Sequence, residues 1–116
     1  MKLCLRPLCL VLQTQRLIPA GFDGYTVGPV VLVRPGTSAA LLVHEQAHAR
    51  QFWRCVGFNG LLYQVSRRWR LRLELEAYRA QLALAGPQAA LQLSAALASQ
   101  YDLNITQEEA YRLLTA

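Results

Sequence analysis

The chain has 116 residues, of which 53% are apolar, and its formal net charge is +5 from 12 basic and 7 acidic residues. This length and apolar content exclude a disordered chain and predict a single globular domain spanning residues 1–116. No apolar run reaches the roughly 18 residues that a membrane span requires. The three cysteines are odd in number and lack zinc-ribbon spacing, so we expect free thiols in a reducing, cytoplasmic setting.

Residues 1–36 are predicted to be strands or extended segments. Met1–Leu12 superficially resembles a signal peptide, but its apolar core is short and interrupted by proline, and no convincing cleavage site follows, so we interpret it as mature sequence. Leu8–Leu12 and Arg16–Ile18 are candidates for short strands. Val30–Val33 is the clearest strand, because a β-branched run is bounded there by Gly-Pro and Pro-Gly pairs.

Residues 37–56 predict a buried helix that is apolar almost all round, capped by Thr37 or Ser38 and ended by a glycine. It holds both histidines of the protein, His44 and His48. Four residues apart on a helix, the two imidazoles share one face and can bind one metal ion. Glu45 lies one position round the helix, where it can accept a proton from a water on that metal. This H-E-x-x-H pattern predicts a zinc site with a glutamate general base.

A catalytic zinc site usually has three protein ligands, so a third is needed. Residues 66–85 predict a second helix that carries Glu74 and Glu76. The two side chains point about 200° apart on a helix, so only one can face the metal. Glu74 lies in an apolar stripe, where a carboxylate is costly unless a cation neutralises it, whereas Glu76 lies near Arg72 and Arg79 on a charged face. We favour Glu74 as the ligand and keep Glu76 as the alternative.

Residues 87–115 are predicted to form the C-terminal helices. Gln88–Gln100 is rich in alanine and leucine, and Thr106–Glu109 reads as a capping box that opens a last short helix. Together with the N-terminal strands, these segments predict an α+β fold that is mainly helical, with a small N-terminal sheet.

Glu74-Leu75-Glu76-Ala77-Tyr78 is similar to the second motif of gluzincins, whose first glutamate binds zinc. With the H-E-x-x-H motif, the chain resembles zincin metallopeptidases of the gluzincin type. The departure is Tyr78, where many relatives place Asp or Asn to hold a zinc-bound histidine. Residues 34–81 also resemble small, uncharacterised zinc peptidases encoded by phages and prophages, which would place the protein in a bacterial cell.

This resemblance implies a minimal zincin-like domain in which the active-site helix is crossed by the ligand helix. It also implies a Zn²⁺ cofactor and a peptide or protein substrate. In such enzymes a strand before the active-site helix pairs with extended substrate, a role that would fall to the edge of Val30–Val33. The alternative is a strand that only covers the helix.

Further polar side chains lie near the predicted site. Gln51 follows His48 by three residues, on the metal-facing side of the helix, and could bond to a ligand or to substrate. Tyr63 and Tyr78 could donate to a developing oxyanion, although tyrosines among leucines more often pack in a core.

Two other functions compete with the peptidase. A basic patch beside Trp69, formed by Arg67, Arg68, Arg70 and Arg72, could bind nucleic-acid phosphates while the indole stacks on a base. It could equally be a solvated helix start whose arginine stems cover apolar surface, or attract acidic substrates. A structural zinc protein or inactive relative would keep the metal without turnover, but such a site has no need of Glu45.

Overall fold

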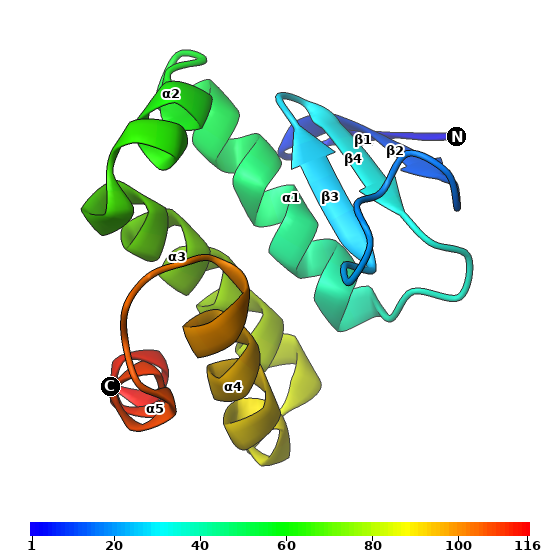
Figure 1. Cartoon of the computed structure of the whole chain (residues 1–116). Coiled ribbons are helices and arrows are strands. Elements are labelled where there is room, and N and C mark those ends of the chain that lie inside the picture. The colour runs from blue at the N-terminus through cyan, green and yellow to red at the C-terminus, as the bar shows by residue number, and fades with distance from the viewer.

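The computed structural model describes all 116 residues. A four-stranded sheet precedes five α-helices, which confirms the predicted α+β, mainly helical fold (Figure 1). The elements are β1 (Lys2–Leu5), β2 (Leu8–Gln13), β3 (Gly24–Val27), β4 (Val30–Val33), α1 (Ala39–Arg54), α2 (Asn59–Val65), α3 (Arg67–Ala85), a 3₁₀ turn η1 (Pro87–Ala89), α4 (Ala90–Gln100) and α5 (Gln107–Thr115). No helix combines the length and the apolar character that crossing a bilayer demands.

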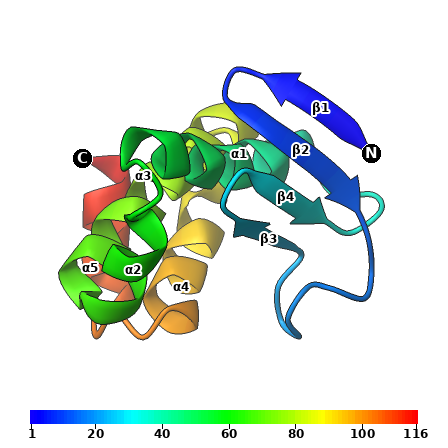
Figure 2. The same ribbon diagram turned by 90° about the horizontal axis from the view of Figure 1, so that it is seen from above.

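The strands lie in the order β1-β2-β4-β3, with β2 parallel to β4 and the other pairs antiparallel (Figure 2). The predicted strands at residues 8–12 and 30–33 are therefore present. The prediction that Val30–Val33 offers a free edge to substrate is wrong, because β4 has a neighbour on both sides. The free edge next to α1 belongs to β3, a strand that the sequence pattern did not reveal.

The predicted strand at Arg16–Ile18 is also wrong, since this stretch is a loop. The side chain of Arg34 fixes this loop, doing what a neighbouring strand would do in a sheet. Its guanidinium donates hydrogen bonds to the carbonyl oxygens of Gln15, Ile18 and Phe22, at 3.0, 3.5 and 3.0 Å. Backbone acceptors that would need a sheet partner are thus satisfied by one arginine.

Helix α1 lies between the sheet and the C-terminal helices, as Figure 1 shows. Ser38 caps it by accepting a hydrogen bond of 3.1 Å from the backbone N–H of Leu41. One side of α1 packs on the sheet through a core of Cys9, Val11, Val31, Val33 and Ala49. The other side packs on α3. Contact on two sides explains why the sequence of α1 is apolar nearly all round.

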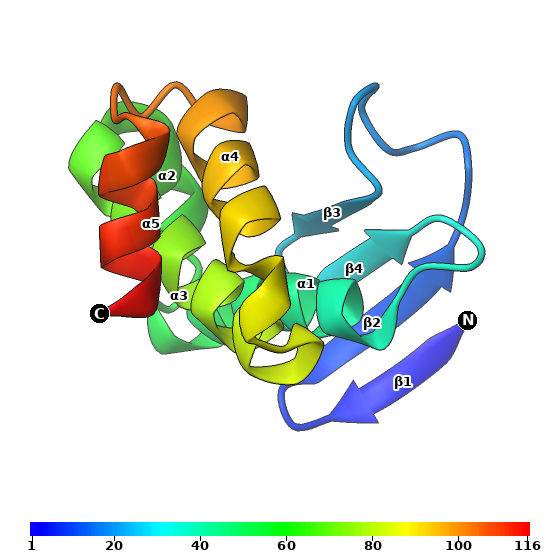
Figure 3. The ribbon, with the colours of Figure 1, turned by 90° about the horizontal axis from the view of Figure 1, so that it is seen from below.

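A second core holds α3, α4 and α5 together, and its members are Tyr78, Leu93, Leu97, Leu103, Ala110 and Leu114. The predicted ends of these helices are confirmed, because Gly86 terminates α3 and the Thr106 capping box opens α5. Figure 3 shows β3 and α4 facing each other across a gap between the two halves of the molecule. The rings of Phe22 and Tyr101 meet across this gap, with centroids 6.0 Å apart.

Candidate metal centre

Helix α1 presents both histidines toward α3. Their ring centroids lie 5.1 Å apart, as expected for positions one turn apart on one helix face. His44 is buried, with 2% of its surface exposed, and the side chain of His48 retains 14% exposure. The pair is therefore largely shielded from water but reachable from one side.

The carboxylate of Glu74 on α3 meets both rings. Its Oε1 lies 3.4 Å from Nε2 of His44 and 3.3 Å from Nε2 of His48, and no hydrogen-bond donor satisfies this buried oxygen. A tetrahedral zinc ion with bonds of about 2.0–2.1 Å separates neighbouring ligand atoms by about 3.4 Å. The three side chains, whose ligand atoms lie within 4.8 Å of one another, therefore fit the donor set and spacing of a zinc site.

The Glu74 carboxylate and the His48 imidazole each shift the pKa of the other. Burial opposes charge on Glu74, but the imidazoles of His48 and His44 outweigh it and lower the pKa of Glu74 to about 2. Burial likewise opposes charge on His48, yet Glu74 raises the pKa of His48 to about 9. The carboxylate thus needs a cation beside it, which a proton on His48 or a metal ion can supply.

Glu76, the alternative ligand, points elsewhere. Its carboxylate forms a two-point ion pair with the Arg54 guanidinium of α1, at 2.8 and 3.1 Å. The partner is thus neither Arg72 nor Arg79, the neighbours suggested by the sequence, because α1 crosses α3 at this position. The structure brings only Glu74 to the histidines.

Gln51 links this ion pair to the histidines, in the position beside the site that the sequence suggested. Its Oε1 lies 2.9 Å from Nδ1 of His48, and its amide N–H groups donate to the carbonyl of Leu73 and to Oε1 of Glu76, both at 2.8 Å. Because the amide nitrogen is committed as donor, Oε1 accepts the proton of Nδ1. The ring tautomer is thereby set with Nε2 toward Glu74, as a metal-binding histidine requires.

The two tyrosines near the site have different roles. Tyr63 of α2 donates a hydrogen bond of 2.7 Å to Oε2 of Glu74, whereas Tyr78 packs its ring edge-on against His44, with centroids 4.4 Å apart. The hydroxyl of Tyr78 bonds to that of Tyr101 at 2.7 Å, so it does not replace the Asp or Asn of gluzincins. Nδ1 of His44 accordingly has no hydrogen-bond partner. Burial raises the pKa of both Tyr63 and Tyr78, which keeps them neutral.

Glu45 lies on the sheet side of the two histidines, under β3. The hydroxyl of Thr26 donates a hydrogen bond of 2.8 Å to Oε1 of Glu45. A Cβ at Gly24 would lie 2.8 Å from Cγ of Glu45, so β3 reaches this distance only because residue 24 lacks a side chain. Burial raises the pKa of Glu45. The sequence pattern did not indicate that Thr26 or Gly24 would contact Glu45, because β3 is only four residues long and carries no strong strand signal.

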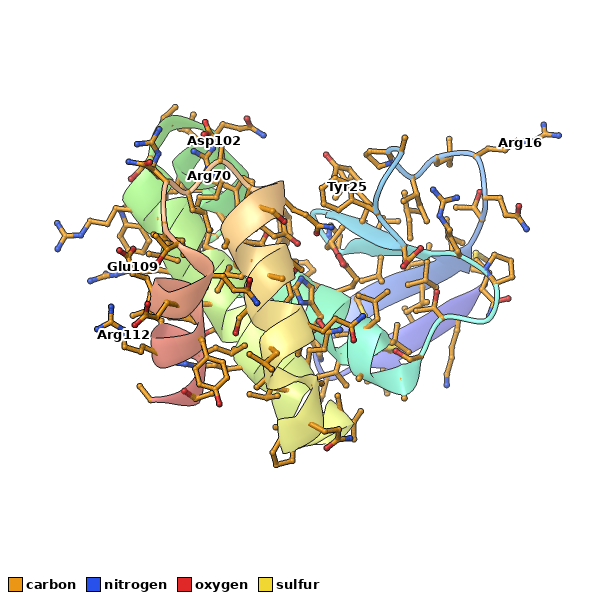
Figure 4. The ribbon with its side chains drawn as sticks, turned by 60° about the horizontal axis from the view of Figure 1, so that its bottom comes forward. Arg16, Tyr25, Arg70, Asp102, Glu109 and Arg112 are labelled. Atoms are coloured by element: carbon orange, nitrogen blue, oxygen red, sulfur yellow. The ribbon has the colours of Figure 1, made fainter.

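A cavity of about 650 Å³ opens over these residues. Strand β3 and the glycine that follows it, residues 24–28, form one wall, and residues 100–102, at and just after the end of α4, contribute to the opposite wall. Its floor includes His44, Glu45, His48 and Glu74. In Figure 4, Tyr25 lies on one side of the gap and Arg70 and Asp102 on the other. The cavity is large enough for several residues of an extended peptide.

The four arginines of the predicted basic patch do not form one surface. Arg67 donates to the carbonyl of Asp102 at 3.2 Å, and Arg72 lies over the Trp69 ring, with its guanidinium carbon 5.3 Å from the centroid. Arg70 lines the cavity, and Arg68 is exposed. Since Arg72 covers one face of the indole, the arrangement offers less for base stacking than the sequence suggested.

No protein-family model, no curated protein and no solved structure matches this chain. The likeness to gluzincins therefore stays a prediction from two short motifs. The functional assignment depends on the geometry of the centre.

Proposed function

We propose that this protein is a zinc-dependent metallopeptidase, with zinc held by His44, His48 and Glu74. The observation that carries the proposal is the position of Oε1 of Glu74, which is buried, lacks a hydrogen-bond donor and lies 3.3–3.4 Å from both histidine nitrogens. An unsatisfied buried carboxylate oxygen is costly, and a shared cation removes that cost.

When bound, zinc supplies Lewis acidity, which polarises a peptide carbonyl and lowers the pKa of a water to about 7. Glu45 then accepts a proton from the attacking water and returns it to the leaving amine. Its hydrogen bond from Thr26 fixes the carboxylate beside the histidines. The raised pKa of Glu45, caused by burial, brings its basicity closer to neutral pH.

The free edge of β3 supports a peptide substrate. Residues 24–28 line the cavity, and no other strand occupies this edge. An extended peptide that pairs with this edge would form backbone hydrogen bonds with β3 and pass over Glu45. The role that the resemblance to zincins implied for Val30–Val33 is thus proposed for β3. As the sequence suggests, we propose a cytoplasmic location.

Zinc content and cleavage of a broad peptide library, measured on the same preparations, test the proposal. The parent should bind one zinc per chain and cleave peptides. Glu45→Gln should keep the zinc and lose about 100-fold or more in rate. The matched control is Glu108→Gln, the same change at an exposed position on α5, which should behave as the parent. Equal cleavage by Glu45→Gln and the parent would exclude Glu45 as the base.

The same experiment separates a structural zinc site from a catalytic one. A structural site would bind zinc in the parent and in Glu45→Gln alike, with no cleavage by either. His48→Ala should lose zinc under both hypotheses, and it should also lose stability because metal binding is coupled to folding.

A further inference from the structure

The guanidinium of Arg70 faces the Tyr63 ring and has no hydrogen-bond acceptor and no carboxylate partner. It is the only lysine or arginine side chain that lines the cavity. No hydrogen bond or ion pair engages its guanidinium, and its Nε is buried without an acceptor. A guanidinium that is partly removed from water and left without an acceptor is ready to bind an anion in a two-point geometry.

Arg70 lies close to the proposed metal centre. It precedes Glu74 by one turn of α3, which corresponds to about 6 Å along the helix. Its guanidinium carbon lies 5.7 Å from the centre of the Tyr63 ring, and the Tyr63 hydroxyl bonds to Oε2 of Glu74. An extended peptide advances roughly 3.3–3.6 Å per residue, so a substrate group at Arg70 would lie two or three residues from the cleaved bond.

None of the three carboxylates that line the cavity forms an ion pair with Arg70. Glu45 and Glu74 belong to the proposed centre, and Asp102 is the remaining carboxylate in the lining. Asp102 and Arg70 lie on the same side of the gap in Figure 4, but they form no ion pair within 4.0 Å. The exposed carboxylate of Asp102 stays in water, so it does not neutralise Arg70.

We propose that Arg70 binds a carboxylate of the substrate, two or three residues from the scissile bond, which makes an acidic or C-terminal segment the preferred peptide. This specificity rests on the proposed peptidase function. The carboxylate can come from the C-terminus of the peptide or from an Asp or Glu side chain, and both present the same planar pair of oxygens to the guanidinium.

The test uses one degenerate peptide mixture in three forms: amidated without acidic residues, amidated with one glutamate, and with a free C-terminus but no acidic residue. Each form is passed over immobilised Glu45→Gln protein with zinc supplied, and retained peptides are quantified by mass spectrometry. At least one carboxylate form should be retained about tenfold better than the neutral form. Whichever form is retained identifies the source of the carboxylate.

Introducing Arg70→Gln into the Glu45→Gln protein should make the retention of the carboxylate and neutral forms nearly equal. Arg70→Lys, which keeps the charge but loses the two-point geometry, should keep part of the preference for a carboxylate. The matched control is Arg68→Gln, which removes the same charge from an exposed position of the same helix and should keep the full preference. Equal retention of all three forms, or an equal loss from Arg68→Gln and Arg70→Gln, would overturn the proposal. Selective retention without any cleavage by the parent would overturn the peptidase function and leave the carboxylate site standing.

Discussion

Tyr63 donates a hydrogen bond of 2.7 Å to Oε2 of Glu74 and thereby orients the other oxygen of that carboxylate toward the two histidines. The two residues belong to different helices, α2 and α3. Helix α2 has no buried residue of its own. Its contribution to the centre is therefore this hydroxyl group, which holds the third proposed ligand in a single orientation.

Replacing Tyr63 with phenylalanine should weaken zinc binding while the fold is retained. The ring keeps its packing, but Glu74 loses the donor that fixes its carboxylate, and partners of this kind typically contribute about tenfold or more in metal affinity. Competition with a chromophoric chelator measures the effect. Tyr111→Phe on α5 is the matched control, because Tyr111 lies outside the cavity. Unchanged zinc affinity in Tyr63→Phe would show that the packing of Glu74 is sufficient to position it.

Gln51→Leu should lower both stability and zinc affinity. The side chain is fully buried and serves His48, the carbonyl of Leu73 and Glu76 at once. A leucine of similar size leaves the Nδ1–H of His48 without an acceptor, which costs roughly 1–3 kcal/mol, and it frees the His48 ring to rotate. Urea unfolding and zinc competition would report the two effects. Gln92→Leu, at an exposed position of α4, should show neither effect.

Gly24→Ala should reduce turnover without releasing zinc. The new methyl group would lie 2.8 Å from Cγ of Glu45, so either β3 or the carboxylate must move. A displacement of the base by about 1 Å can cost roughly 100-fold in rate. Steady-state kinetics with zinc analysis distinguishes this from a loss of metal. Gly60→Ala meets no atom within 4 Å and should be silent; if both variants were equally active, Glu45 would not need its contact with β3.

The sequence predicted that His44, His48 and Glu74 would lie close together because the information needed is local. Spacing of four residues places His44 and His48 on one helix face whatever surrounds them, and the apolar stripe around Glu74 indicated that this carboxylate, and not Glu76, would be buried. Only 3% of the Glu74 surface is exposed, which agrees with that reasoning. The helix ends followed from Ser38, Gly86 and Thr106 for the same local reason.

The hydrophobic pattern of the sequence did not reveal which segments far apart in the chain contact each other. Val30–Val33 is the most hydrophobic strand because it lies inside the sheet, and periodicity alone did not reveal its neighbours. The short β3, with Gly24 and Thr26, carries no strong strand signal, yet it supplies both contacts to Glu45. The partner of Glu76 was misjudged because Arg54 approaches from another helix, and sequence spacing describes only neighbours on the same one.

The metal-free protein should be most stable between about pH 4.5 and 6.5, where Glu74 is ionised and His48 is protonated. Glu74 raises the pKa of His48 from 6.5 to about 9 against the opposing effect of burial, so this contribution is complete below pH 6.5 and disappears as pH rises through 9. The pKa of Glu74 is lowered from 4.5 to about 2, because His48 and His44 outweigh burial. Its contribution is complete above pH 4.5 and disappears as pH falls through 2.

Melting temperatures of chelator-treated protein across this range would show the decline above pH 6.5. Glu74→Gln removes the partner of His48 and should flatten that decline, while Glu108→Gln should not. Zinc should reverse the slope, because it binds neutral His48 and competes with the proton there. A metal-free protein whose stability rose from pH 6.5 to pH 9 would mean that His48 is neutral beside Glu74. The positive charge that stabilises the buried Glu74 carboxylate would then come from a group other than His48.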